Sequence, residues 1–153
     1  MTDMTMEKGR ELIDRAVEGL QTDYPEGSLT VSEMPTNERV VSLPANALHR
    51  VVETLVERFE IHHLSTITGQ DTGEAIELLY HFWHGAGLTL RVRLNRDAAS
   101  VDSVTDLIPG ALFYEREVSE MLGVTLKDLP DPRALLLPDE WDEPPPLRKS
   151  GGE

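Results

Sequence analysis

Two carboxylates, Glu117 and Glu120, stand three residues apart in a segment whose apolar residues have helical spacing. Such residues are neighbours on a helix, and a carboxylate pair could in principle act as general acid and base. The sequence supplies no nucleophile and no oxyanion-binding motif beside them, which argues against a catalytic use. The neighbouring Glu115 and Arg116 leave another interpretation, a solvated charged helix face on which Arg116 pairs with Glu120.

Histidines are the next candidates for chemistry, because four of the five fall in or beside predicted strands. His62 and His63 are adjacent, so on a strand they point to opposite faces and cannot share one local metal site. No HExxH pattern accompanies them or His81 and His84, and neither a phosphate-binding glycine loop nor a GxSxG motif occurs. No sequence motif therefore supports a metal-binding, nucleotide-binding or hydrolase function.

Composition narrows the function classes further. The 153 residues suit one compact domain, and 28 Asp and Glu against 14 Lys and Arg give a net charge of -14. This excess argues against nucleic acid or an anionic membrane as the main partner. The chain has no cysteine, so it can hold no disulfide and no Cys-ligated iron–sulfur cluster, and we expect no cofactor. No apolar run approaches the ~18 residues of a spanning helix, which predicts a cytoplasmic protein without a membrane span.

Apolar periodicity predicts the elements of an N-terminal domain over residues 1–124. Helical spacing marks residues 12–20 and, more clearly, the segment opened by Pro44 and running to Phe59. The third helix begins at Ile108-Pro109-Gly110 and is closed by Gly123, where a left-handed cap is common. Strands are expected at 29–34, 39–43, 61–68, 75–84 and 88–94, with hairpin turns at 35–37 and 85–87.

This order, helix, two strands, helix, three strands, helix, is typical of a two-layer α+β domain with a mostly antiparallel mixed sheet. From residue 125 the character changes. Six of the ten prolines lie in residues 125–153, so this tail is expected to run extended. It nevertheless carries Leu135, Leu136, Leu137 and Trp141, which need a surface to cover them, either the domain's own or a partner's.

The third helix and the tail together resemble the 30 kDa subunit family of NADH-quinone oxidoreductase, also called its C subunits. Glu115, Arg116, Glu117, Met121 and Gly123 fall on the family's helix signature, and the chain departs from it with Ser119-Glu120 in place of an aromatic-plus-Asp pair. The stretch before the signature is closer to relatives in membrane-bound energy-converting hydrogenases, formate hydrogenlyases and F420-type dehydrogenases. The resemblance rests on residues 108–124, residues 133–141, and the closing Pro146, Leu147, Arg148 and Lys149.

The resemblance implies a subunit with no active site or cofactor of its own, in an oxidoreductase complex of NADH dehydrogenase or group 4 hydrogenase type. It would lie in the peripheral electron-transfer arm against the large hydrogenase-like catalytic subunit, near the small iron–sulfur subunit, and meet the membrane only through the complex. We expect Leu135 to Leu137 and Trp141 to be buried anchors and Arg148 to pair with a partner carboxylate. The full predicted partner-binding set is Glu115, Arg116, Glu117, Glu120, Arg133, Leu135, Leu136, Leu137, Trp141, Leu147, Arg148 and Lys149.

A different class of function stays open beside this one. A free-standing acidic binding module could offer Pro144, Pro145 and Pro146, with nearby Arg148, to an aromatic-lined groove. That interpretation leaves Leu135 to Leu137 and Trp141 unexplained. Removal of residues 125–153 separates the two, because the docking hypothesis predicts a folded domain that no longer assembles.

Overall fold

The fold was obtained as a computed structural model that describes residues 2–36, 38–131, 133, 135–138 and 140–149. Asn37 of the expected turn, and Pro132, Ala134, Asp139 and residues 150–153 of the tail, lie outside the described residues. The helices and strands are α1 (Thr2–Asp23), β1 (Thr30–Glu33), β2 (Arg39–Leu43), the 3₁₀ turn η1 (Ala45–Ala47), α2 (Leu48–Phe59), β3 (Leu64–Asp71), β4 (Ala75–Trp83), β5 (Gly87–Asn95), β6 (Ser100–Asp102), α3 (Ala111–Leu122) and β7 (Thr125–Lys127).

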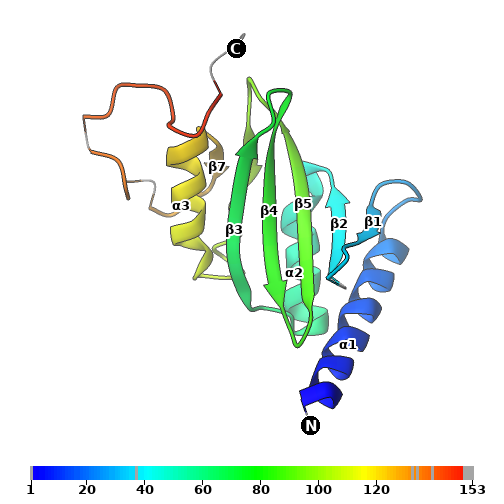
Figure 1. The fold of residues 1–153 in the computed structure, drawn as a ribbon. Helices are drawn as coiled ribbons and strands as arrows, with labels where there is room; N and C mark the ends of the chain where they lie inside the picture. The colour runs from blue at the N-terminus through cyan, green and yellow to red at the C-terminus, as the bar shows by residue number, and fades with distance from the viewer. Residues whose placement is uncertain (1, 37, 132, 134, 139, 150–153) are drawn as a thin grey trace.

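Five strands form one mixed sheet in the order β1-β2-β5-β4-β3 (Figure 1). Only the β2–β5 pair is parallel, and the other three pairs are antiparallel. The chain between β2 and β5 runs through α2, β3 and β4, which provides the long connection that parallel neighbours need. The α+β class and the mostly antiparallel mixed sheet predicted from the sequence are confirmed.

Strands β6 and β7 form a second, two-stranded parallel sheet that the periodicity did not predict. Each strand has three residues, too few for an alternation signal, although Val101 and Leu126 at its centre are buried. Thr125–Lys127, assigned to the tail by composition, is therefore strand β7. The division into a domain and a tail, and the extended form of that tail, stay predictions.

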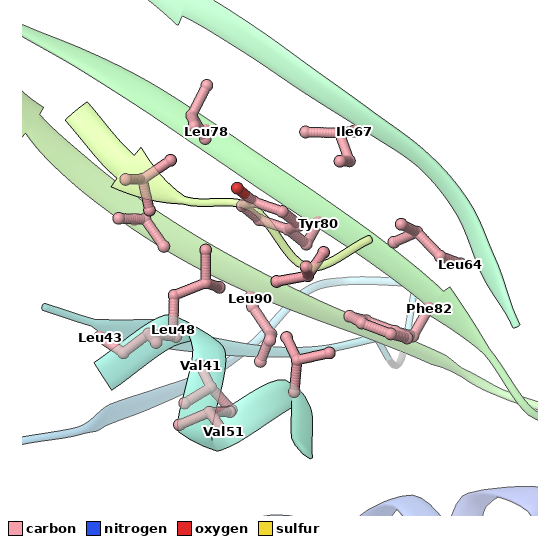
Figure 2. Close-up of a cluster of buried hydrophobic side chains, with 14 of the residues drawn as sticks. Val41, Leu43, Leu48, Val51, Leu64, Ile67, Leu78, Tyr80, Phe82 and Leu90 are labelled. Carbon is pink, nitrogen blue, oxygen red and sulfur yellow. The ribbon is translucent and has the colours of Figure 1, made fainter. Parts of the chain in front are cut away.

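The core lies between the sheet and α2 (Figures 1 and 2). The apolar stripe of α2 is buried against inward side chains of β4 and β5, among them Leu90 and the fully buried Tyr80. Burying one such large side chain contributes about 1.5–3 kcal/mol. Within the described part of the chain, no helix combines the length and the apolar character that a membrane crossing needs.

Helix α1 crosses the β4–β5 turn at very short range. A Cβ added at Gly9 would lie 2.3 Å from the carbonyl oxygen of His84 and 2.6 Å from the Cα of Gly85. Gly85 also has a positive φ of 72°, which glycine adopts without strain. The two glycines thus let a helix backbone touch a turn backbone.

Helix α3 packs beside β3 and leads into the tail (Figure 1). Gly123 caps it in the left-handed conformation, φ 70°, and donates its N–H to Ser119 O at 2.9 Å, as its position in the sequence predicted. Leu122 lies against Gly69 of β3, where an added Cβ would be 2.5 Å from Leu122 Cδ1. This close packing fixes the face that α3 offers to the tail.

Candidate functional site

Glu115 lies inside the molecule with no exposed surface. Ser103 Oγ donates to its Oε2 at 2.7 Å, and the Val104 N–H donates to its Oε1 at 2.8 Å. Burial raises the pKa of this carboxyl, and the two hydrogen bonds only partly oppose that effect. Glu115 therefore joins α3 to the segment after β6, and the expectation of a solvated charged face fails at this residue.

Arg116 is also largely buried and turns toward the tail. Its Nε donates to the carbonyl oxygen of Arg133 at 2.9 Å, and its Nη1 lies 3.6 Å from a carboxylate oxygen of Asp131. The Nε and Nη2 of Arg133 donate to the carboxylate of the same Asp131, each at 2.8 Å. These hydrogen bonds hold the pKa of that carboxyl well below its usual range. The first part of the tail is thus attached to α3 at Arg116.

Glu120 makes a second attachment one helical turn later. Its two carboxylate oxygens accept the backbone N–H groups of Leu135, at 2.5 Å, and Leu136, at 2.7 Å. Residues four apart share one helix face, so Arg116 and Glu120 hold the tail along a single line. Helical spacing predicted that Glu120 pairs with Arg116. In the structure the Glu120 carboxylate accepts hydrogen bonds from tail amides.

The tail returns to the C-terminal end of the same helix. Leu147 donates its N–H to Met121 O at 2.8 Å. The Arg148 guanidinium donates to the carbonyl oxygen of Leu122 and, at 2.7 Å, to that of Arg96. Arg148, expected to pair with a partner carboxylate, thus uses its guanidinium within the chain. The reason is that carbonyls at a helix C-terminus lack intrahelical partners and attract a cation.

Asp71, at the end of β3, receives the last described tail residue. It accepts the Lys149 N–H at 2.8 Å, the Gly73 N–H at 2.8 Å, and two nitrogens of Arg96 at 2.8 to 3.0 Å. Arg96 also donates to the Lys149 carbonyl oxygen. The hydrogen bonds from Arg96 are the main reason that the pKa of Asp71 lies well below its usual range.

Between these attachments the chain leaves α3 and comes back, as the orange and red trace of Figure 1 shows. We call the described residues from 128 to 147 the tail loop. Its apolar side chains are exposed: Leu136 and Leu147 by 57%, Trp141 by 39% and Leu135 by 36%, with Leu137 half-buried. Phe113 of α3 adds a side chain that is 58% exposed. Large apolar side chains left exposed on this loop and on α3 make the loop a candidate site of interaction.

Glu117 and Lys149, the other predicted partner-binding residues, are exposed. Glu117 lines a hollow of about 200 Å³ with Thr66 and Leu147. Glu120, by contrast, accepts hydrogen bonds from the tail. Sequence reasoning missed Asp71, Arg96 and Phe113. Asp71 and Arg96 lie more than fifty residues before the tail groups they bind, so no local pattern connects them.

The histidines make ordinary contacts. The Nε2 of His81 is 3.0 Å from Thr68 Oγ1, and its Nδ1 is 3.1 Å from Thr89 Oγ1. His62 and His63 are exposed. Across the residues that the structure describes, no group of three or more His, Cys, Asp or Glu residues is placed to hold a metal ion.

Residues 41–151 match the model of the 30 kDa subunit of the respiratory-chain NADH dehydrogenase. Because the match spans more than half of the chain, the protein belongs to this family, and the resemblance found from the sequence is confirmed. The C subunit of the F420H2 dehydrogenase of Methanosarcina mazei is 32% identical over 139 residues, which cover 87% of both chains. The C subunit of the NADH-quinone oxidoreductase of Moorella thermoacetica is 32% identical over 142 residues, 90% of this chain and 93% of that one.

In a third relative, the matched region is part of a longer protein. Hydrogenase-4 component G of Escherichia coli is 32% identical over 139 residues, 85% of this chain but only 25% of its own length. Two solved structures share the fold. The Nqo5 fragment described as trypsin-resistant has a TM-score of 0.67 at 20% identity, covering 78% of this chain and 98% of its own. A chain of the archaeal membrane-bound sulfane sulfur reductase has a TM-score of 0.66 at 21% identity, covering 92% and 84%.

Proposed function

We propose that this chain is a non-catalytic scaffold subunit in the peripheral electron-transfer arm of a complex of this family. The complex would be a complex I-like NADH-quinone oxidoreductase, a membrane-bound hydrogenase or an F420 dehydrogenase, as the names of the relatives suggest. The tail loop docks on the large hydrogenase-like catalytic subunit, with the small iron–sulfur subunit nearby. The protein is cytoplasmic and meets the membrane only through the complex.

The observation that carries this proposal is an apolar loop held at both ends by the domain beneath it. Arg116 and Glu120 fix its start, and Arg148 with Asp71 fixes its return. Association costs free energy for every group that must be ordered, and a loop already held in place loses less. Full burial of one large apolar side chain contributes about 1.5–3 kcal/mol, and each of these partly exposed side chains gains a fraction of that when a partner covers it.

The predicted residues divide into three roles in this proposal. Leu135, Leu136, Leu137, Trp141 and Leu147 are the anchors that a partner covers. Glu117, Arg133 and Lys149 lie at the exposed rim, where charges set orientation more than affinity. Glu115, Arg116, Glu120 and Arg148 position the loop through contacts inside the chain.

The test is a triple variant, Leu135→Ser, Leu136→Ser and Trp141→Ser, expressed with an affinity tag in the native host in place of the natural copy. Purification from membranes in mild detergent should recover the large hydrogenase-like subunit and the cluster-bearing small subunit with the natural chain. The triple variant should recover at least tenfold less of both, because three apolar contacts are lost.

Met34→Ser is the matched control, since Met34 is 46% exposed and lies outside the tail loop. This variant should recover both subunits at the natural yield. A triple variant that still recovers them at that yield would contradict docking through the tail loop. A natural chain recovered alone would favour the free-standing binding module instead.

A further inference from the structure

A second apolar hollow, of about 360 Å³, lies away from the tail loop. It is formed where the N-terminal half of α1, the β4–β5 turn and the connection between β1 and β2 converge (Figure 1). Met6, Trp83 and Ala86 provide its apolar walls, and Met6 and Trp83 are each about half exposed. We call this site the α1 hollow.

The backbone contact between Gly9 and Gly85 holds the α1 hollow in shape. Because these two glycines bring helix and turn together without side chains between them, two walls of the hollow are in direct backbone contact. Met6 and Arg10, four residues apart on α1, both line the hollow. The hollow is therefore present before any partner arrives.

The charges at the α1 hollow are not balanced. Arg10 is paired with Glu33 at 3.2 Å, and Glu33 also binds Arg39 at 2.7 Å. Glu7 and Glu38 line the hollow, and among the described side chains neither has an ion pair. Glu38 has one contact of 3.5 Å with the Thr89 hydroxyl. Two carboxylates thus border the apolar wall, and Arg10, the cation that lines the hollow with them, is already paired with Glu33.

We propose that the α1 hollow binds a lysine or arginine side chain carried by another protein of the complex. The aliphatic part of such a side chain fits against Met6 and Ala86, as amphipathic side chains commonly bury their stems. Its cation meets the exposed face of Trp83 and the carboxylates of Glu7 and Glu38. An anionic lipid surface is disfavoured by the same two carboxylates.

The α1 hollow and the tail loop stand far enough apart to serve two different contacts. Ile76, which pairs with the tail-binding Asp71, and Trp83 of the hollow are seven residues apart on β4. At about 3.4 Å per residue this is about 24 Å. One chain could therefore join two polypeptides, and the α1 hollow does not depend on what the tail loop binds.

The test places a photo-reactive benzoylphenylalanine at Met6 in the tagged, assembled complex, followed by irradiation and mass spectrometry of the cross-linked peptides. The expected product is a peptide of another subunit with Lys or Arg beside the cross-link. The double variant Glu7→Lys and Glu38→Lys should lower the yield at least tenfold, and exchange of the identified basic residue for Glu should restore it. A probe at Leu136 should keep its yield throughout, which shows that the variant chain is folded and assembled.

Four results would overturn this proposal while leaving docking through the tail loop intact. They are a recovered complex with no cross-link from position 6, a cross-link to a second copy of this chain, a cross-link to lipid alone, and a yield that charge reversal does not change. Failure to recover any complex with the natural chain would overturn both proposals. The probe at Leu136 thus distinguishes the two.

Discussion

At the scale of single residues, Glu115 shows how a charged signature residue can serve the fold. Its carboxylate joins α3 to the chain after β6 through Ser103 and Val104, out of contact with solvent. The position of Glu115 on a helix did not predict these contacts, because the two partners lie eleven and twelve residues earlier, in a loop without periodicity. Arg116, its neighbour, faces the tail instead.

The raised pKa of Glu115 predicts a pH-dependent effect of Glu115→Gln. A raised pKa means that the folded chain holds this proton more tightly, so the stability from protonated Glu115 is present at low pH and is lost as pH rises. The variant keeps an oxygen to accept from Val104 but cannot ionise. Its free energy of unfolding, relative to the natural chain, should therefore rise as the pH increases above about 4.5, the ordinary pKa of this carboxyl, as urea denaturation would measure.

Glu117→Gln is the matched control for this prediction, since it removes one carboxylate from an exposed position of the same helix. If the free energy of unfolding of both variants changed in the same way with pH, the effect would come from the net charge of the chain and not from the buried site. A Glu115→Gln difference that stayed constant with pH would contradict the account of Glu115.

At the scale of elements, α3 and the tail loop form one unit, since the helix supplies attachment points to both ends of the loop. Arg148→Ala should release the returning end. Hydrogen bonds to a charged group contribute about 1.5–3 kcal/mol each, so the loss of one already permits tenfold faster opening. Hydrogen–deuterium exchange should show the amides of residues 147–149 exchanging at least tenfold faster, with those of β4 and β5 unchanged.

Arg133→Ala provides the control for this measurement. Arg133 is exposed and its guanidinium contacts Asp131, so the same substitution leaves the contacts of Arg148 in place. The amides of residues 147–149 should then exchange as in the natural chain. Equal protection of these residues in Arg148→Ala and the natural chain would mean that the attachment at Arg148 does not hold the loop.

The contact between α1 and the β4–β5 turn leads to another prediction. Gly9→Ala places a methyl group where the His84 carbonyl stands 2.3 Å away, so the helix or the turn must move. We expect a loss of about 1–3 kcal/mol in the free energy of unfolding, despite the better helix propensity of alanine. Gly19→Ala in the same helix should lose less, because its methyl meets the end of the Phe59 side chain. Thermal and urea denaturation measure both, and equal losses would contradict a tight contact at Gly9.

Elements with a periodic pattern were the ones that the sequence predicted well. The apolar stripe of α2 and the alternation of β5 extend over enough residues to give a signal, and Gly123 marks the end of α3. The third predicted strand began at Ile61, but β3 begins at Leu64. Ile61 is apolar because it is buried after α2, where its N–H bonds to Leu55 O. Burial without strand pairing gives the same pattern as a strand.

At the scale of the whole molecule, the sequence could indicate which residues form the site but not how they meet. The apolar residues of the tail and the charges of α3 were predicted as candidates, and their attachment through Asp71 and Arg96 was not. The α1 hollow was missed for the same reason, since Met6 and Trp83 belong to distant segments joined only by the fold. Contacts between distant segments leave no local periodicity.

The central claim is that the tail loop is covered by a partner subunit, and hydroxyl-radical footprinting of the isolated chain and the assembled complex tests it most directly. Leu136 and Trp141 are exposed in the chain alone, so radicals should oxidise both there. In the complex we predict at least fivefold less oxidation of the tail loop peptide, relative to a free reporter peptide added to both samples as the dose reference. Equal oxidation of Trp141 in the two samples would contradict docking through this loop.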